Sequence, residues 1–227
     1  MTNARANILR RLRDGADVAA PPAAPDVGAY YRQHRIHQDP AARLTCFRAA
    51  MEAAHAEVHD TDADSWPTLI HRIAAAKGVR SLLVGAGTRE SARLVDAPAD
   101  DSLLVVPYAH TVDTWRDGLF CDIDAGLSRA RSAIAATGSL VLWTGPDEPR
   151  LLSLVPPIHF VLLDARCIHA DLHEAMMAER WSDGLPTNVV VVSGPSKTAD
   201  IQQTLAYGAH GPRELVVLLV HGTEAAT

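Results

Sequence analysis

The sequence has few cysteines, and their spacing matches no metal-binding motif. Cys46, Cys121 and Cys167 stand 75 and 46 positions apart, and no CxxC or CxxxC pair occurs. Iron–sulfur clusters and structural zinc ions are held by closely spaced cysteines, or by cysteines and histidines at set spacings. We therefore expect no iron–sulfur cluster and no metal site in this chain. An odd number of cysteines in a cytosolic setting also argues against disulfides.

Long apolar runs and a surplus of positive charge are absent as well. No stretch approaches the roughly 20 apolar residues that span a bilayer, and residues 1–14 lack the apolar core of a signal peptide. The 21 basic side chains are outnumbered by 27 acidic ones, for a net charge of −6. Nothing therefore favours binding to a phosphate backbone. We expect a cytoplasmic protein with no membrane span and no nucleic-acid partner.

The first third of the chain is predicted to be helical. Residues 1–14 are expected to form a short helix, which the Ala/Pro-rich linker at residues 16–29 cannot continue. At 227 residues with 48% hydrophobic content, the chain has room for one α/β domain and a small addition. We therefore divide it into an N-terminal helical extension, residues 1–78, and an α/β domain, residues 79–227.

Two further helices are predicted inside this extension. Asp39 can cap a helix that begins at Pro40, and apolar residues then recur in steps of three and four as far as Val58. Ser65 is a second candidate cap, and Gly78 is a candidate stop. The pattern indicates one amphipathic helix on either side of residue 60.

From residue 80 onward, short apolar runs alternate with helix-sized segments, which is typical of parallel strands joined by crossover helices. The candidate strands are Ser81–Val84, Ser102–Val106, Ser139–Trp143, His159–Leu163, Asn188–Ser193 and Glu214–Val220. The candidate helices are Arg89–Val95, Leu127–Ala136, His169–Trp181 and Lys197–Tyr207. We therefore predict an α/β fold, with six strands in one mostly parallel sheet and flanking helices.

The strongest candidate site is a loop that follows an apolar strand. Its residues are Ser193, Gly194, Pro195, Ser196, Lys197 and Thr198. If a helix begins at Ser196, the backbone N–H groups of Lys197 and Thr198 and the Lys197 ammonium suit a carboxylate or phosphate. An ordinary capped turn with an exposed lysine fits the same residues. The loop lacks the spacing of a P-loop, so a Walker-type ATPase is not supported.

Two more glycine loops are candidates for ligand binding. Gly85 and Gly87 follow a predicted strand, but Glu90 occupies the third glycine position of the dinucleotide fingerprint, which argues against NAD. Thr137 and Gly138 precede a predicted strand, so Gly138 is expected to be a helix C-cap. A role in binding would require that loop to reach across the sheet.

Histidine is plentiful, with 11 residues, but its arrangement is mostly unremarkable. His55 and His59, like His169 and His173, have the spacing that could share a metal on a helix, yet neither pair belongs to an HExxH motif. We expect all four to face solvent. His210 lies between glycines after the candidate loop, which makes it a candidate proton acceptor as well as a turn residue.

Four segments in the last hundred residues together resemble a known family. They are Ala133-Ile-Ala-Ala-Thr-Gly-Ser-Leu-Val-Leu142, Ser153-Leu-Val-Pro-Pro-Ile-His159, Ser193-Gly-Pro-Ser-Lys-Thr-Ala-Asp-Ile201 and Gly208-Ala-His-Gly-Pro212. Their order and spacing resemble the LUD domain of the lactate utilization protein C family (LutC/YkgG). The resemblance covers roughly residues 80–220.

The resemblance implies a fold similar to the NagB/RpiA/CoA-transferase class, whose members bind sugar phosphates, acyl-CoA or folate derivatives. It also implies a role in oxidising L-lactate to pyruvate with two iron–sulfur partner proteins, which would hold the clusters. The sequence departs from the family pattern at Ala136, where an acidic residue commonly stands, and at Gln202, where Glu is frequent. A carboxylate base is thus not expected at either position.

We therefore expect a component of an L-lactate utilization system that binds a small anionic ligand. One alternative is a stand-alone isomerase or acyl/CoA-transferase-like enzyme. Such transferases use a glutamate nucleophile, and no Glu lies at the ends of the predicted central strands. Another alternative is a non-catalytic assembly subunit. The sequence identifies no cofactor.

Overall fold

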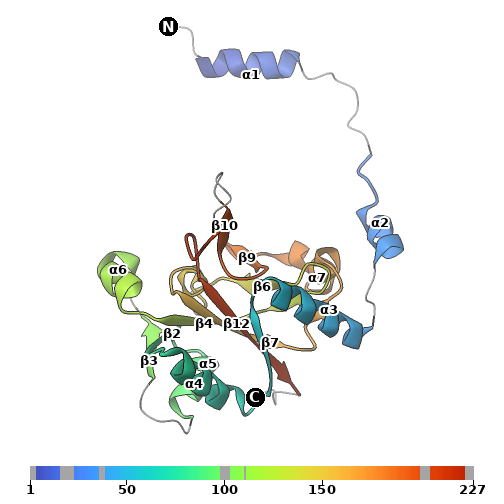
Figure 1. Ribbon diagram of the computed structural model, residues 1–227. Coiled ribbons are helices and arrows are strands. Elements are labelled where there is room, and N and C mark those ends of the chain that lie inside the picture. Colours follow the sequence, from blue (N-terminus) through green and yellow to red (C-terminus); the bar gives the residue numbers. More distant parts are fainter. Residues whose placement is uncertain are drawn as a thin grey trace. The chain divides into compact units, whose positions relative to one another are not determined.

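The chain forms two compact units, Met1–His34 and Arg35–Thr227 (Figure 1). The computed structural model describes residues 4–15, 23–35, 39–97, 103–109, 111–199 and 205–222. The boundary drawn from the sequence, between residues 78 and 79, falls inside the second unit. The reason is that Glu57–Asp62 is a strand of the main sheet, so it folds with the residues that follow.

The first unit consists of two short helices. Helix α1 spans Ala4–Asp14, which confirms the helix predicted there, and none of its residues is buried. Helix α2 spans Val27–His34 and begins within the predicted linker. Its start is capped by Asp26, which accepts a hydrogen bond from the Ala29 N–H at 2.8 Å. Residues 16–22 of the linker lie outside the described residues.

Helix α3 begins where the sequence predicts and ends earlier. It spans Pro40–Ala53, and the Asp39 carboxylate caps it by accepting from the Ala42 N–H at 3.0 Å. The predicted continuation to Val58 is wrong, because strand β1, Glu57–Asp62, takes its place and pairs with the last strand of the chain. His55 makes the turn between them with φ of 69°.

Helix α4 spans Trp66–Lys77 and ends at Gly78 in the left-handed conformation (φ 70°), as predicted. Ser65 precedes it, but its side chain makes no capping bond. Its hydroxyl instead donates to the Asp62 carboxylate at 2.8 Å. The carboxylate of Asp62, rather than the predicted cap, therefore organises the start of this helix.

The main sheet has six parallel strands in the order β1-β12-β7-β4-β2-β3. The other five strands are β2 Ser81–Gly85, β3 Leu104–Tyr108, β4 Ala125–Arg129, β7 Ile158–Asp164 and β12 Glu214–His221. Helices α4 and α5 (Arg89–Val95) cover one face with an apolar cluster around Ile70 and Leu94. The predicted α/β class is confirmed.

A second, four-stranded sheet covers the opposite face of the main sheet together with α3. Its order is β8-β5-β6-β9, with antiparallel pairs β5/β6 and β6/β9. The strands are β5 Ser132–Ile134, β6 Ser139–Trp143, β8 Ile168–His169 and β9 Val189–Val192. The prediction of a single sheet is therefore wrong, because two of the six predicted strands belong to this one.

Two predicted helices are strands. The segment Leu127–Ala136 contains the end of β4 and all of β5. The segment Lys197–Tyr207 is bounded by the antiparallel strands β10 Lys197–Ala199 and β11 Leu205–Tyr207, with residues 200–204 outside the described residues. The remaining elements are α6 Val112–Cys121, η1 Arg150–Ser153, α7 Leu172–Ala178 and η2 Trp181–Asp183. Of these, α7 lies inside the predicted helix His169–Trp181.

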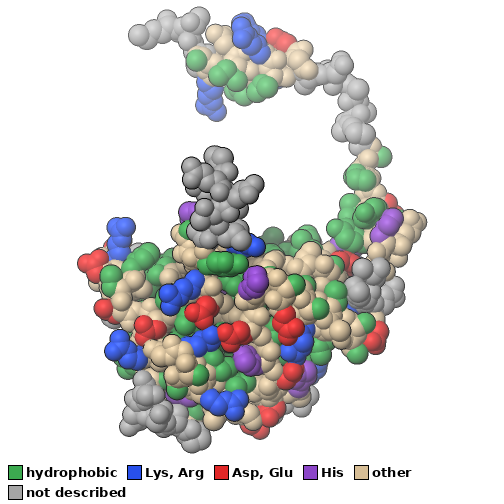
Figure 2. All heavy atoms as spheres, viewed as in Figure 1, with side chains coloured by type: hydrophobic (Ala, Val, Ile, Leu, Met, Phe, Trp, Pro, Cys, Tyr) green, Lys and Arg blue, Asp and Glu red, His purple; other side chains and the backbone are tan. Residues whose placement is uncertain are grey.

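The surface carries charges of both signs. Figure 2 shows basic and acidic side chains interspersed on the drawn face of the second unit, with no continuous basic patch there. Within the described part of the chain, no helix has the length and apolar character needed to cross a membrane.

Two glycines let the segment after β6 press against the main sheet. A Cβ at Gly85 would clash with the Asp147 carbonyl oxygen, and a Cβ at Gly126 would clash with the Leu152 carbonyl oxygen. The obstructing atoms belong to the backbone, so no side-chain rotation can relieve the clash. The segment that follows Gly145 thus lies directly over β2 and β4.

Gly126→Ala is expected to lower the free energy of unfolding by about 3 kcal/mol, because backbone must move to admit the methyl group. The matched control is Gly145→Ala, where an added Cβ meets nothing within 4 Å, and a change within about 0.5 kcal/mol is expected. Urea denaturation of both variants measures the difference. Equal stability of the two variants would contradict this packing.

Candidate functional site

Two of the predicted loops meet in the second sheet. The Ser139 and Ser193 hydroxyls are 2.6 Å apart, and the Thr137 and Ser139 hydroxyls are 2.7 Å apart. Because β6 and β9 are antiparallel, the start of one strand lies beside the end of the other. The Thr137 loop therefore needs no reach across the sheet. We call Thr137, Ser139 and Ser193 the hydroxyl cluster.

Glycines beside the hydroxyl cluster allow α3 to approach both loops. Gly138 has φ of 56° and Gly194 has φ of 133°. A Cβ at Gly138 would clash with Ala50, and one at Gly194 would crowd Ala54. Gly138 is not the predicted helix C-cap, because the turn joins β5 to β6 rather than a helix to a strand.

The predicted helix start at Ser196 is wrong, because Lys197 and Thr198 belong to strand β10. Ser196 instead ties two motifs together. Its N–H donates to the Pro212 carbonyl at 2.8 Å, and its carbonyl accepts from the Gly208 N–H at 3.0 Å. The structure thus brings the Ser193–Ile201 motif and the Gly208–Pro212 motif together through Ser196. It does not form the helix N-terminus that was expected to bind an anion.

The remaining residues of these motifs lie nearer to solvent. Lys197 and His210 are exposed, and Pro195 is half-buried. The His210 N–H donates to the Ser196 hydroxyl at 3.3 Å, so the backbone of His210 is placed by the same serine. Its imidazole projects from an exposed turn.

Gly85 and Gly87 lie at the carboxyl end of β2 in the main sheet, not in the sheet that carries the hydroxyl cluster. Gly87 has φ of 69°. Thr88 follows it and caps α5, since its hydroxyl accepts from the Ser91 N–H at 3.2 Å and donates to the Gly85 carbonyl at 3.0 Å. These glycines shape a βα turn.

The histidine pairs do not share a helix face. His55 lies in a turn and His59 in β1, whereas His169 lies in β8 and His173 in α7. The His55 ring meets Tyr207 edge-on, with centroids 6.2 Å apart. Across the ranges that the structure describes, no three His, Cys, Asp or Glu side chains are grouped to hold a metal ion.

A polar cluster that sequence analysis missed lies at the carboxyl end of β4. The Glu148 carboxylate accepts from the Arg129 N–H at 2.6 Å, and the Arg129 guanidinium pairs with Glu90 at 3.1 Å. The Ser128 hydroxyl hydrogen-bonds to Glu148 and lies 3.0 Å from His159 Nε2. We call these five residues the Glu148 cluster.

Burial and like charge set the protonation of this cluster. Burial raises the pKa of Glu148 to about 7, assisted by the Glu90 carboxylate and opposed by the Arg129 N–H. Burial lowers the pKa of His159 to about 3, so the imidazole is neutral at physiological pH. Glu148 is therefore the group of this cluster that exchanges a proton near neutrality.

The Glu148 cluster escaped prediction because β4 was assigned to a helix. No Glu lies at the carboxyl end of a predicted strand, but Glu148 lies beside the carboxyl end of β4, a strand that was not predicted, where it accepts a hydrogen bond from the Arg129 N–H. The sequence held one signal of this cluster, which was the presence of His159 within the otherwise apolar run 158–163.

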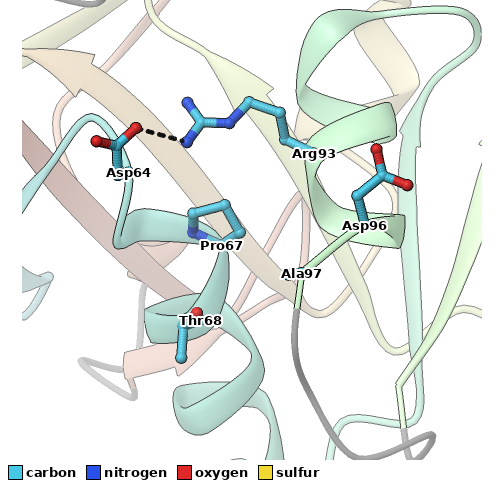
Figure 3. A pocket seen from close by; sticks show the side chains of 6 residues that line it. All are labelled: Asp64, Pro67, Thr68, Arg93, Asp96 and Ala97. Atoms are coloured by element: carbon cyan, nitrogen blue, oxygen red, sulfur yellow. Dashed lines mark ion pairs between the residues drawn. The ribbon is translucent and has the colours of Figure 1, made fainter.

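Pockets open elsewhere on the second unit. One of about 230 Å³ lies between α4 and α5, where Arg93 pairs with Asp64 at 3.6 Å and Asp96 lines the far side (Figure 3). A neighbouring pocket of about 520 Å³ shares Asp64 and Thr68 with it. Neither contains a residue predicted from the sequence to bind a ligand.

The LUD domain matches residues 44–220 of this chain. An uncharacterized protein of Neisseria meningitidis serogroup B is 42% identical over 96% of this chain and 94% of its own length. Lactate utilization protein C of Exiguobacterium sp. is 32% identical over 43% of this chain and 44% of its own, and that of Bacillus subtilis is 27% identical over 43% and 42%. These two alignments thus span less than half of each relative.

A solved structure is similar in fold. It is a DUF162 family protein from Deinococcus radiodurans, with a TM-score of 0.58 and 23% identity, covering 82% of this chain and all of that one. At this identity the likeness concerns the fold alone.

Glu148→Gln is expected to stabilise the protein progressively as pH rises. The pKa of Glu148 is about 7 in the folded protein and 4.5 in the unfolded chain. Between these two pH values the unfolded chain has already lost the proton that the folded protein still holds, so the stability of the wild type decreases as pH rises from 4.5 to 7. Glutamine does not titrate. Between pH 5 and pH 8 the variant should gain about 2 to 3 kcal/mol relative to wild type, measured by urea denaturation.

Glu57→Gln provides a control, because the pKa of Glu57 is shifted in the opposite direction to the pKa of Glu148. Partial burial acts to raise the pKa of Glu57, but the hydrogen bonds and charges of Lys77 and His59 together outweigh it and lower the pKa below its ordinary value. This variant should gain nothing over the same pH interval. A similar gain in both variants would show that Glu148 has no special environment.

Proposed function

Because the chain belongs to the LUD domain family, we propose that it is a component of an L-lactate utilization system. The observation that carries this proposal is its similarity to proteins named lactate utilization protein C. In this role the chain binds a small anionic ligand and acts with other subunits in the oxidation of L-lactate to pyruvate.

The proposed partners are iron–sulfur subunits that carry the electrons. The three cysteines are far apart in the chain: Cys46 lies in α3, Cys121 at the end of α6 and Cys167 before β8. The Cys46 thiol donates to the Ala135 carbonyl at 3.3 Å. Cluster ligation needs several thiolates on one small site, so the clusters of such a system belong to the partners. This chain then contributes binding and assembly rather than electron transfer.

The proposed ligand site is the pair of loops around the hydroxyl cluster. Ser193 and Thr137 supply hydroxyl donors on exposed residues, while Gly138 and Gly194 beside them pack against Ala50 and Ala54 and so hold the two loops in place. The loop continues through Pro195 and Ser196 to Lys197 and Thr198, where the exposed ammonium adds positive charge. His210 is the proposed proton acceptor.

Deletion of the gene from its host is expected to abolish or strongly slow growth on L-lactate as the sole carbon source, with normal growth on pyruvate as the control. Wild-type protein should restore growth. Undiminished growth on L-lactate, in a strain with no other lactate dehydrogenase, would refute the proposed function.

Lys197→Ala is expected to weaken anion binding at least tenfold, since it removes the positive charge of the proposed loop site. Thermal-shift titration of the full chain with L-lactate and with inorganic phosphate measures the effect. The matched control is Arg116→Ala, which removes an exposed cation from α6. Unchanged binding in Lys197→Ala would exclude the loop as the anion site.

The position of Glu148 favours one alternative more than the sequence did. A stand-alone acyl or CoA transferase of this fold class requires a glutamate, and one lies at the carboxyl end of a central strand. Turnover of acyl-CoA by the isolated chain, lost in Glu148→Gln, would favour that enzyme over a subunit of a lactate-oxidising complex.

A further inference from the structure

The main sheet has a topological switch point between β2 and β4. From β2 the chain moves to β3 at one edge, and from β4 it moves in the other direction to β7. In open parallel sheets, ligands bind outside the carboxyl ends of the strands at the point where the strand order reverses. Any ligand that follows this rule would lie at the ends of β2 and β4.

The two strands separate at their carboxyl ends. They pair only through Leu82 with Ala125 and Leu83 with Gly126. Beyond that pair, the N–H of Arg129 on β4 donates to Glu148 instead of to a strand on the β2 side. The Asp147 carbonyl meanwhile lies against Gly85 at the end of β2. Glu148 therefore occupies the switch point itself.

Polar groups from three elements surround Glu148. Arg129 comes from β4, Glu90 comes from the first turn of α5, and the neutral His159 comes from β7 and is linked to Glu148 through the Ser128 hydroxyl. The Arg129 guanidinium thus lies near the carboxylates of Glu90, Glu148 and Asp164. Asp164 is itself paired with Arg166 at 2.6 Å, so that pair adds no net charge. Protonation of one carboxylate makes the Glu90, Arg129 and Glu148 group neutral.

The group is reachable from solvent although its centre is shielded. The Glu90 side chain is 20% exposed and that of Arg129 is 35% exposed, while Glu148 is half-buried. Solvent therefore reaches the Arg129 and Glu90 side chains of the cluster.

We propose that the Glu148 cluster binds a small monocarboxylate, which Arg129 and the protonated Glu148 hold together, so that binding takes up one proton. The proposal rests on the proposed function for its expected ligand, L-lactate. The only covalent change in this step is the transfer of one proton from solvent to the Glu148 carboxylate, and the ligand carboxylate accepts hydrogen bonds.

Charge explains why the proton is needed. With Glu148 ionised, the three groups carry a net negative charge and repel an anion. With Glu148 neutral, its O–H becomes a donor to the ligand while its other oxygen still accepts from the Arg129 N–H. Because the pKa of Glu148 is about 7, this change falls in the physiological range.

The test is titration calorimetry of the full chain with L-lactate and with acetate, from pH 6 to pH 9 and in buffers of different ionisation enthalpy. Wild-type affinity should fall about 100-fold over this range, tenfold for each pH unit above 7. Proton uptake should approach one per ligand bound at pH 8. Glu148→Gln should bind with an affinity that is independent of pH, because glutamine offers the same donor and acceptor as the protonated acid.

Glu90→Gln tests the same electrostatics without touching the proton-binding group. Removing the Glu90 charge lowers the repulsion on Glu148, so the pH midpoint of binding should move downward. A midpoint that stays in place, or moves upward, would contradict the inferred coupling.

Other outcomes separate this inference from the proposed function. Binding of acetate with uptake of a proton, in the absence of any binding of L-lactate, would support the site and count against the lactate role. The inference fails if neither ligand binds, or if binding is independent of pH in the wild type. Binding that Ser193→Ala abolishes, and whose pH dependence Glu148→Gln leaves unaltered, would overturn it as well, placing the ligand at the hydroxyl cluster while leaving the lactate role intact.

Discussion

The pairing of β12 between β7 and β1 is the interaction on which the rest of the fold depends. This strand is the last element described in the chain, yet it lies inside the sheet, and its residues 215–220 are all buried. Its two neighbours come from residues 57–62 and 158–164, so the sheet closes only when distant segments meet. Such non-local pairing is slow to form and carries little local signal.

This dependence separates the features that the sequence predicts from those that it does not. The Asp39 cap, the Gly78 stop and the apolar run of β12 depend on residues a few positions apart, and each was identified. Strand β1 is different. Its residues continue a helical spacing from α3, and only β12 makes them a strand. The Leu127–Ala136 and Lys197–Tyr207 segments were misassigned for the same reason, because their partners lie elsewhere in the chain.

The candidate sites follow the same division. The loop that contains Ser193 and Ser196 could be identified as a candidate site because the motifs at Ser193–Ile201 and Gly208–Pro212 occur in this order. The hydrogen bond from the Ser196 N–H to the Pro212 carbonyl could not, because it depends on a hairpin that the sequence did not indicate. Glu148 could not be anticipated at all. Its role depends on the separation of β2 from β4, which no local pattern encodes.

The two sites differ in the chemistry that they can perform. The proposed loop site offers neutral donors in the hydroxyl cluster and the exposed Lys197, so an anion bound there would require no change in the charge of the site. The Glu148 cluster differs, because the half-buried Glu148 carboxylate beside Glu90 must gain a proton before an anion can approach. His159 cannot supply that proton, since its own burial keeps the imidazole neutral. Proton exchange at the switch point is therefore a property of Glu148 and of solvent, and it links any anion bound there to the pH around the protein.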